Sequence, residues 1–220
     1  MTTLTGHRAP AKSGTTKSLV ILLHGYGADG ADLFGLANPL SEHMPDTAFR
    51  APNAPQRNAM NPMGYQWFPI PWLDGSTDEQ RDQGFAEAVV ALNAYIDASM
   101  EEEGVTPSQT ALIGFSQGTM MSLHVAPRRA EPIAGIVGFS GRLIPGDDLA
   151  DVPSKPPVLL VHGDMDEMIN VSEMSTAETA LRAAGFDVAS HISRGIGHGI
   201  APDGLTLGLQ FLMQHLGYGD

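Results

Sequence analysis

The sequence of 220 residues contains no cysteine. This absence excludes a disulfide framework, a thiolate nucleophile and a zinc site with cysteine ligands. If the chain carries a nucleophile, we therefore expect it to be an oxygen atom.

Basic residues and long apolar runs are also scarce. The chain has 12 Lys and Arg against 25 Asp and Glu, a formal net charge of -13 at pH 7. Such a charge repels phosphate backbones and anionic membrane surfaces, so we predict no nucleic-acid partner. No segment approaches the ~18 apolar residues of a membrane span, and the first residues lack the apolar core of a signal peptide. We therefore expect a cytoplasmic protein without a membrane span.

What is present is a globular composition without an internal boundary. Hydrophobic residues make up 42% of the chain and charged residues 17%, which is enough apolar material for a packed core. No linker or change of composition divides the chain, so we predict one domain over residues 1–220.

Short apolar runs alternate with helical patterns along the chain. The runs rich in Val, Ile and Leu predict buried parallel strands at Leu19–Leu23, Ala111–Gly114, Ile133–Phe139 and Val158–Val161, with a further strand at Asp187–Ser193. Apolar spacing predicts helices around residues 85–96, 116–126 and 172–184, and after residue 202. This alternation predicts an α/β fold with a mainly parallel central sheet, helices on both faces, and ligands at the carboxyl ends of the strands.

Residues 51–76 interrupt the alternation with several prolines and a group of Met and aromatic side chains. Long apolar loops are often functional, so these side chains are candidates for a substrate-binding surface. The candidates are Met63, Trp67, Phe68, Ile70 and Trp72. Two alternatives stay open: the segment folds onto the core, or its apolar side chains support a homodimer.

A Gly-x-Ser-x-Gly motif spans Gly114–Gly118, directly after a predicted strand and before a predicted helix. In that context the tight turn holds the hydroxyl of Ser116 outward in a strained backbone conformation. The backbone N–H of Gln117 lies at the helix start, where unpaired donors favour developing negative charge. Ser116 is therefore the predicted nucleophile, although the glycines alone are equally compatible with a structural turn.

The loop after the first strong strand is rich in glycine and lies beside the predicted elbow. It reads Leu23–Gly30, and the backbone N–H of Tyr26 is the candidate for a second oxyanion donor. A structural tight turn is one alternative. A dinucleotide loop is another, because Gly25, Gly27 and Gly30 match the G-x-G-x-x-G spacing, but the acidic residue expected ~20 residues later is not evident.

A serine nucleophile needs a histidine base and an orienting carboxylate, in the chain order Ser, Asp, His on this kind of sheet. Asp166 follows the strand at 157–161 and is the preferred acid, with Asp164 in reserve and Asp147 less suited. His198 lies in the glycine-rich turn after the last strand and is the predicted base. The remaining histidines form no H-E-x-x-H pair or ligand cluster, so we expect neither a metal nor a cofactor.

Several of these segments together resemble the phospholipase/carboxylesterase family of α/β-hydrolases, which includes acyl-protein thioesterases. They are Leu23–Gly30, Arg50–Pro55, Trp67–Phe68, Gly114–Gly118, His162–Asp166 and Gly197–His198. The resemblance implies an α/β-hydrolase fold without a large cap domain, and a triad of Ser116, Asp166 and His198, which selects Asp166 over Asp164. The family usually has leucine at the position of Tyr26 and a Trp-Tyr pair at residues 67–68, so the acyl groove differs here.

The combined prediction is a serine carboxylesterase that cleaves esters of short to medium acyl chains through an acyl-enzyme. Its partner would be a small-molecule ester or thioester. Acyl thioesterase or lysophospholipase activity on the same triad is the alternative, because one oxyanion hole serves each leaving group. A non-catalytic ligand-binding protein with the same architecture is the alternative from another class.

Overall fold

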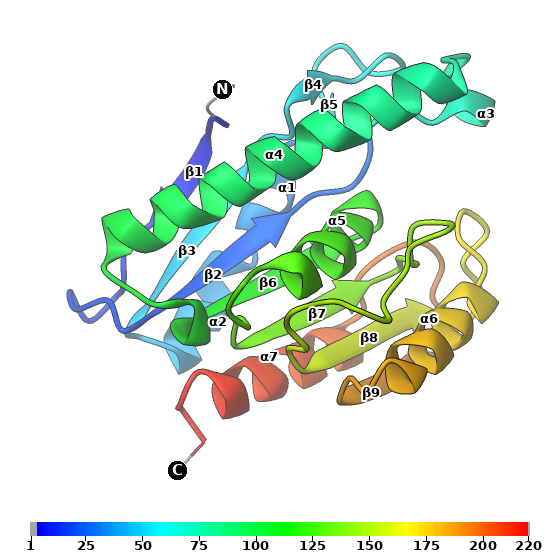
Figure 1. Cartoon of the computed structure of the whole chain (residues 1–220). Helices are drawn as coiled ribbons and strands as arrows, with labels where there is room; N and C mark the ends of the chain where they lie inside the picture. Colours follow the sequence, from blue (N-terminus) through cyan, green and yellow to red (C-terminus); the bar gives the residue numbers. More distant parts are fainter. Residues whose placement is uncertain (1–3, 220) are drawn as a thin grey trace.

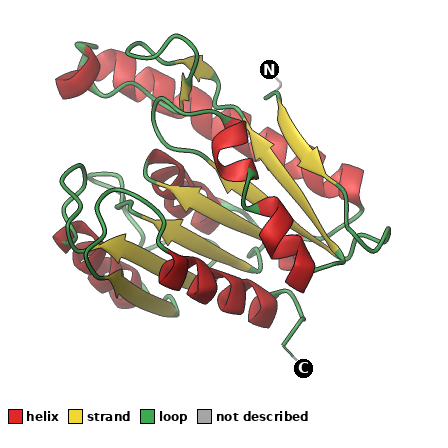
Figure 2. Cartoon of the chain, turned by 180° about the vertical axis from the view of Figure 1, so that it is seen from behind, coloured by secondary structure: helices red, strands yellow, loops and turns green. Residues whose placement is uncertain are grey.

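The computed structural model describes residues 4–219, which fold around one seven-stranded sheet with helices on both faces (Figures 1 and 2). The strand order is β1-β3-β2-β6-β7-β8-β9. The strands are β1 (Gly6–Ala9), β2 (Ser18–Leu23), β3 (Thr47–Pro52), β6 (Thr110–Phe115), β7 (Gly135–Phe139), β8 (Val158–Gly163) and β9 (Val188–Ser193). Only β1, at one edge, pairs antiparallel; the other neighbours in this sheet are parallel. The predicted mainly parallel sheet is confirmed.

The helices divide between the two faces because side chains alternate along the strands. Leu19, Ile21 and Leu23 belong to one buried cluster, whereas Val20 and Leu22 belong to the other. The first cluster packs under α4 (Asp78–Glu103), α5 (Gln117–Val125) and α6 (Ser172–Ala183). The second packs under α1 (Gly30–Phe34), α2 (Ala37–His43) and α7 (Pro202–His215). Figure 1 shows the first face and Figure 2 the second.

The hydrophobic pattern did not predict β1 and β3. All side chains of β3 are buried, but Arg50 interrupts its apolar run. The guanidinium of Arg50 is paired with the buried carboxylate of Glu103, with Nη2 and Oε1 2.7 Å apart. The sequence pattern does not reveal this strand, because the residue that compensates its buried charge, Glu103, lies at the far end of α4.

The segment 51–76 is partly packed onto the core and partly exposed at the surface. It contains the end of β3, a hairpin of β4 (Gln56–Arg57) and β5 (Tyr65–Gln66), and the short helix α3 (Pro71–Asp74). Trp67 and Phe68 are buried, but Met63 and Trp72 are 80% and 73% exposed. The base of the segment is thus packed core, and its tip and α3 lie at the surface beside one end of α4 (Figure 1).

Within residues 4–219, no helix combines the length and the apolar character that a bilayer crossing requires.

Candidate active site

Ser116 lies at the sharp turn between β6 and α5. Its backbone has φ 53° and ψ -115°, in the positive-φ range that a residue other than glycine rarely adopts. Its N–H donates to the carbonyl of Phe139 on the neighbouring strand at 2.9 Å. A Cβ on Gly118 would lie 1.9 Å from the carbonyl oxygen of Leu23. The turn therefore requires glycine there, and the strain predicted for Ser116 is present.

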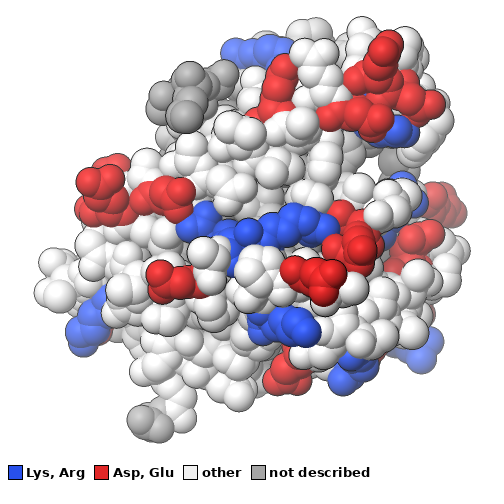
Figure 3. Space-filling view, viewed as in Figure 1, with Lys and Arg blue, Asp and Glu red and all other residues white. Residues whose placement is uncertain are grey.

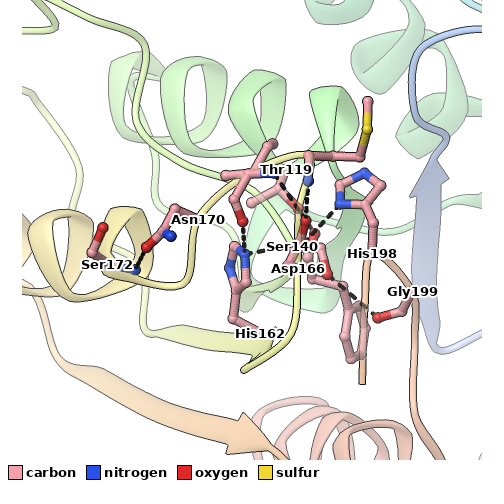
Figure 4. Close-up of polar contacts among 11 residues, drawn as sticks. Thr119, Ser140, His162, Asp166, Asn170, Ser172, His198 and Gly199 are labelled. Atoms are coloured by element: carbon pink, nitrogen blue, oxygen red, sulfur yellow. Dashed lines mark hydrogen bonds and ion pairs between the residues drawn. The ribbon is translucent and has the colours of Figure 1, made fainter. Parts of the chain in front are cut away.

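Asp166 and His198 meet beyond the carboxyl ends of β8 and β9 (Figure 4). Nδ1 of His198 lies 2.8 Å from Oδ2 of Asp166, and the carboxylate side chain is fully buried. Oδ1 accepts hydrogen bonds from the N–H groups of Met168 and Ile169, each at 2.9 Å. Because the carboxylate can only accept, Nδ1 of His198 carries the proton and Nε2 is left as the acceptor.

The surroundings of Asp166 favour its ionised form. Burial alone would raise the pKa of Asp166, but hydrogen bonds from the Ile169 N–H and from His198 outweigh it and hold the pKa below its usual value. An ionised carboxylate next to Nδ1 stabilises a positive charge on the His198 ring.

His162 is a further partner of this carboxylate, which the sequence reasoning did not include. Its Nε2 lies 3.2 Å from Oδ2 of Asp166 and 2.8 Å from the carbonyl oxygen of Ile169. Figure 4 shows His162 and His198 on opposite sides of Asp166. His162 lies near the end of β8, four residues before Asp166, but this spacing alone does not indicate the contact.

The reserve acids lie elsewhere. Asp164 accepts a hydrogen bond from the N–H of Gly195 at 2.6 Å, so it closes the turn that precedes His198. Asp147 lies 2.7 Å from Nδ1 of His124, and neither residue lines the cavity of the elbow.

Ser116 and His198 line one cavity of about 660 Å³. The ring of Phe115 packs against that of His198, with centroids 4.9 Å apart. Of the substrate-binding candidates, Phe68, Ile70 and Trp72 line this cavity.

Met63 and Trp67 are not part of the cavity lining. Met63 projects from the exposed tip of the segment. Trp67 is fully buried, and its indole N–H donates to the carbonyl of His24 at 3.0 Å. Its backbone N–H donates to Oε1 of Gln117 at 2.9 Å, so Trp67 anchors the segment beneath the site. A large aromatic residue in the sequence does not distinguish a lining role from an anchoring one.

Tyr26 lines the same cavity from the loop after β2, and Gln117 lines it from the first turn of α5. Among residues 4–219, neither backbone N–H has a hydrogen-bond partner. Both side chains are held away: Nε2 of Gln117 donates to the carbonyl of Phe68 at 2.8 Å, and the Tyr26 hydroxyl donates to Asp74 at 2.9 Å. Burial raises the pKa of Tyr26 to about 12, so its hydroxyl stays neutral. This arrangement offers two free backbone donors beside Ser116.

Comparisons with known proteins show the family of the chain. The family model described as phospholipase/carboxylesterase matches residues 7–216. The crystal structure of esterase PE8 has a TM-score of 0.91 and 44% sequence identity, over 98% of this chain and 100% of that one.

Two curated relatives match over almost the same length. Esterase YpfH of Escherichia coli is 28% identical over 92% of this chain and 83% of its own. Acyl-protein thioesterase 1 of Gibberella zeae is 29% identical over 94% of each. The resemblance seen in the sequence motifs is thereby confirmed: the chain belongs to the phospholipase/carboxylesterase family of α/β-hydrolases.

Proposed function

We propose that the protein is a serine carboxylesterase that hydrolyses small esters of short to medium acyl chains through an acyl-enzyme. The observation that carries the proposal is one cavity lined by the strained Ser116, by His198 with its ring bonded to the buried Asp166, and by two unpaired backbone donors. Esterase names among the relatives support the reaction class.

In the proposed mechanism, Nε2 of His198 removes the proton of the Ser116 hydroxyl as its oxygen attacks the ester carbonyl. The carbonyl oxygen becomes an oxyanion, which the N–H groups of Tyr26 and Gln117 stabilise. The protonated ring gives its proton to the leaving alcohol, and the acyl group stays on Ser116. Water, deprotonated by His198, then attacks this acyl-enzyme and releases the acid, while the proton returns to Ser116.

The cavity supports an acyl chain of limited length. Its apolar wall includes Phe68, Ile70, Trp72 and Phe85, and Pro69 contributes to it as well. Thioester cleavage is the second candidate, because several relatives carry the name acyl-protein thioesterase. A sulfur leaving group needs less protonation by His198 than an alkoxide does, so the same residues serve both reactions.

The test uses p-nitrophenyl esters of increasing chain length with the wild type and Ser116→Ala. We expect hydrolysis by the wild type, a maximum at short or medium chains, and loss of turnover in the variant. Ser122→Ala is the matched control, because its hydroxyl only donates to the carbonyl of Gly118 on the same helix. Rates of hydrolysis of alkyl esters and of matched alkyl thioesters then show which of the two reactions the protein prefers. A folded wild type without turnover on any ester or thioester would favour the non-catalytic binding protein.

The remaining partner predictions follow from charge and surface. The formal net charge of -13 at pH 7 supports a protein that does not bind nucleic acid. On the face in Figure 3, the Lys and Arg side chains form a band across the middle, with Asp and Glu side chains beside it. We also infer one domain in a cytoplasmic protein. A homodimer through the exposed Met60 and Met63 stays a prediction, which light scattering on the purified protein tests.

A further inference from the structure

Arg142 lies in the wall of the cavity that holds Ser116 and His198. Its Nε is shielded from solvent and has no hydrogen-bond partner within residues 4–219. The ion pairs of this part of the chain likewise include no carboxylate for its guanidinium. Arg142 as a whole is half-buried, so its shielded Nε lacks an acceptor while the rest of its guanidinium stays open to a ligand. A shielded N–H without an acceptor is unfavourable in the free protein, and an anionic ligand would relieve that cost.

The other arginine of the cavity differs in this respect. Nη1 of Arg81 lies 2.6 Å from Asp78, and its Nη2 lies 2.9 Å from Asp82. Its charge is therefore already compensated, and its side chain is 41% exposed at the cavity mouth. Of the two arginines that line the described cavity, Arg142 is the one that offers unused donors.

The chain before Arg142 is fixed against the catalytic residues. Gly141 packs so closely on the elbow that a Cβ there would lie 3.0 Å from the carbonyl oxygen of Ser116. Ser140 has φ 47°, and its hydroxyl donates to the carbonyl of Gly199, next to His198, at 3.3 Å. The backbone of Arg142 therefore begins at a set position beside the nucleophile.

The chain after Arg142 is fixed as well. Asp147 accepts hydrogen bonds from Nδ1 of His124 at 2.7 Å and from Nη2 of Arg128 at 3.1 Å. Its N–H donates to the carbonyl of Ile144, which lines the cavity, at 3.0 Å. The segment that carries Arg142 is thus tied to α5 at its far end, and binding an anion requires little further ordering of the loop.

We propose that Arg142 binds an anionic group of the substrate, either a carboxylate or a phosphate, and makes small anionic esters the preferred substrates. This inference rests on the proposed esterase function and names its substrate class. The planar guanidinium donates in a fork that matches both anions. Glu173 also lines the cavity, but it lies in the first turn of α6, where the helix dipole offsets its charge.

The test compares esters that differ only in an anionic group. Monomethyl glutarate is set against methyl pentanoate for a carboxylate on the acyl side, and acetylglycerol phosphate against acetylglycerol for a phosphate on the alcohol side. Each pair is measured with the wild type, Arg142→Gln, Arg142→Lys and the control Arg81→Gln. Because Arg142 has no hydrogen bond in the described chain, its substitution should leave the melting temperature unchanged.

We expect the wild type to prefer at least one anionic ester, and Arg142→Gln to lower the anionic-to-neutral ratio of kcat/KM about ten- to a hundredfold, mainly through KM. Arg142→Lys should retain part of the preference, and Arg81→Gln should keep the ratio. The pair that responds identifies the anion.

A wild type that hydrolyses only the neutral esters, or a ratio that survives Arg142→Gln, overturns the inference while the esterase function stands. A folded wild type that cleaves p-nitrophenyl esters but none of these four esters likewise overturns only the inference. A folded wild type that cleaves neither set overturns the esterase function and this inference with it.

Discussion

Two histidines within residues 4–219 pair through Nδ1 with a largely buried aspartate, in almost equal geometry. Nδ1 of His198 lies 2.8 Å from Asp166, and Nδ1 of His124 lies 2.7 Å from Asp147. Of these four residues, only His198 lines the cavity that holds Ser116. The ring of His124 instead packs edge-on against Phe85, with centroids 4.7 Å apart.

The carboxylates also differ in their other partners. Asp166 accepts hydrogen bonds from two backbone N–H groups and lies 3.2 Å from a second histidine, His162. Asp147 instead also accepts a hydrogen bond from the guanidinium of Arg128. A His–Asp hydrogen bond therefore does not by itself define a base. We expect His198 to act as the base because it lines the same cavity as Ser116. We call the contacts of Asp147 with His124 and Arg128 the clamp.

The largest effect should separate the two histidines. We expect His198→Ala to lower kcat/KM for p-nitrophenyl butyrate by about 10⁴-fold or more, because no other group takes the proton of Ser116. His124→Ala should keep the rate within about tenfold, since it touches neither the nucleophile nor the oxyanion donors. Steady-state kinetics on both folded variants tests this expectation. Equal losses of kcat/KM in the two variants would contradict the different roles of His198 and His124.

The second effect should separate the two acids. Asp166→Asn keeps the shape of the site but no longer fixes the tautomer of His198, and we expect a loss of about 10⁴-fold in kcat. Asp147→Asn serves as the matched change in the clamp, with kcat close to that of the wild type. A small loss in Asp166→Asn would move the role of orienting acid to another residue.

The clamp, in which Asp147 binds His124 and Arg128, should contribute to the free energy of unfolding. Asp147→Ala removes the acceptor of His124 and Arg128, and we expect the free energy of unfolding to fall by about 1–3 kcal/mol. For a chain of this size each kcal/mol lowers Tm by roughly 2–4 °C. Thermal unfolding followed by circular dichroism measures it. An unchanged Tm would show that the loop needs no clamp.

The smallest expected effect is a change in the free energy of unfolding with pH. The pKa of Asp166 is lowered in the folded protein, so its ionised form adds stability above the unfolded pKa of about 3.9, and this contribution is lost as the pH falls through the lower folded value. The difference in unfolding free energy between the wild type and Asp166→Asn should therefore be largest near neutral pH and narrow below about pH 4. Urea titrations at both pH values test the sign.

Much of the fold was predictable because local patterns and the fold agree. Buried parallel strands read as apolar runs, so the strand at 158–163 could be found, and the glycines of the elbow are demanded by close backbone approach. The strand at 47–52 was not predicted, because the charge of Arg50 is compensated by Glu103, which lies far away in the sequence at a helix end. The sequence separation conceals such pairs.

The site was predictable to a similar limit. Chain order and the strand-turn-helix context indicated Ser116 and His198 and favoured Asp166 as the acid. The family resemblance agreed with that choice and separated Asp166 from Asp164. Three further roles depend on tertiary contacts. Trp67 donates a hydrogen bond to Gln117, His162 contacts Asp166, and Asp147 pairs with His124 of α5. No local spacing encodes those contacts.

The central claim is that Ser116 is the nucleophile activated by His198, and covalent labelling tests it most directly. The wild type, Ser116→Ala, His198→Ala and His124→Ala are treated with a fluorophosphonate probe, and intact mass and peptide mapping follow the adduct. We predict one adduct on Ser116 in the wild type and in His124→Ala, none in Ser116→Ala, and strongly slowed labelling in His198→Ala. An adduct on another residue, or labelling that persists in Ser116→Ala, would contradict the assignment.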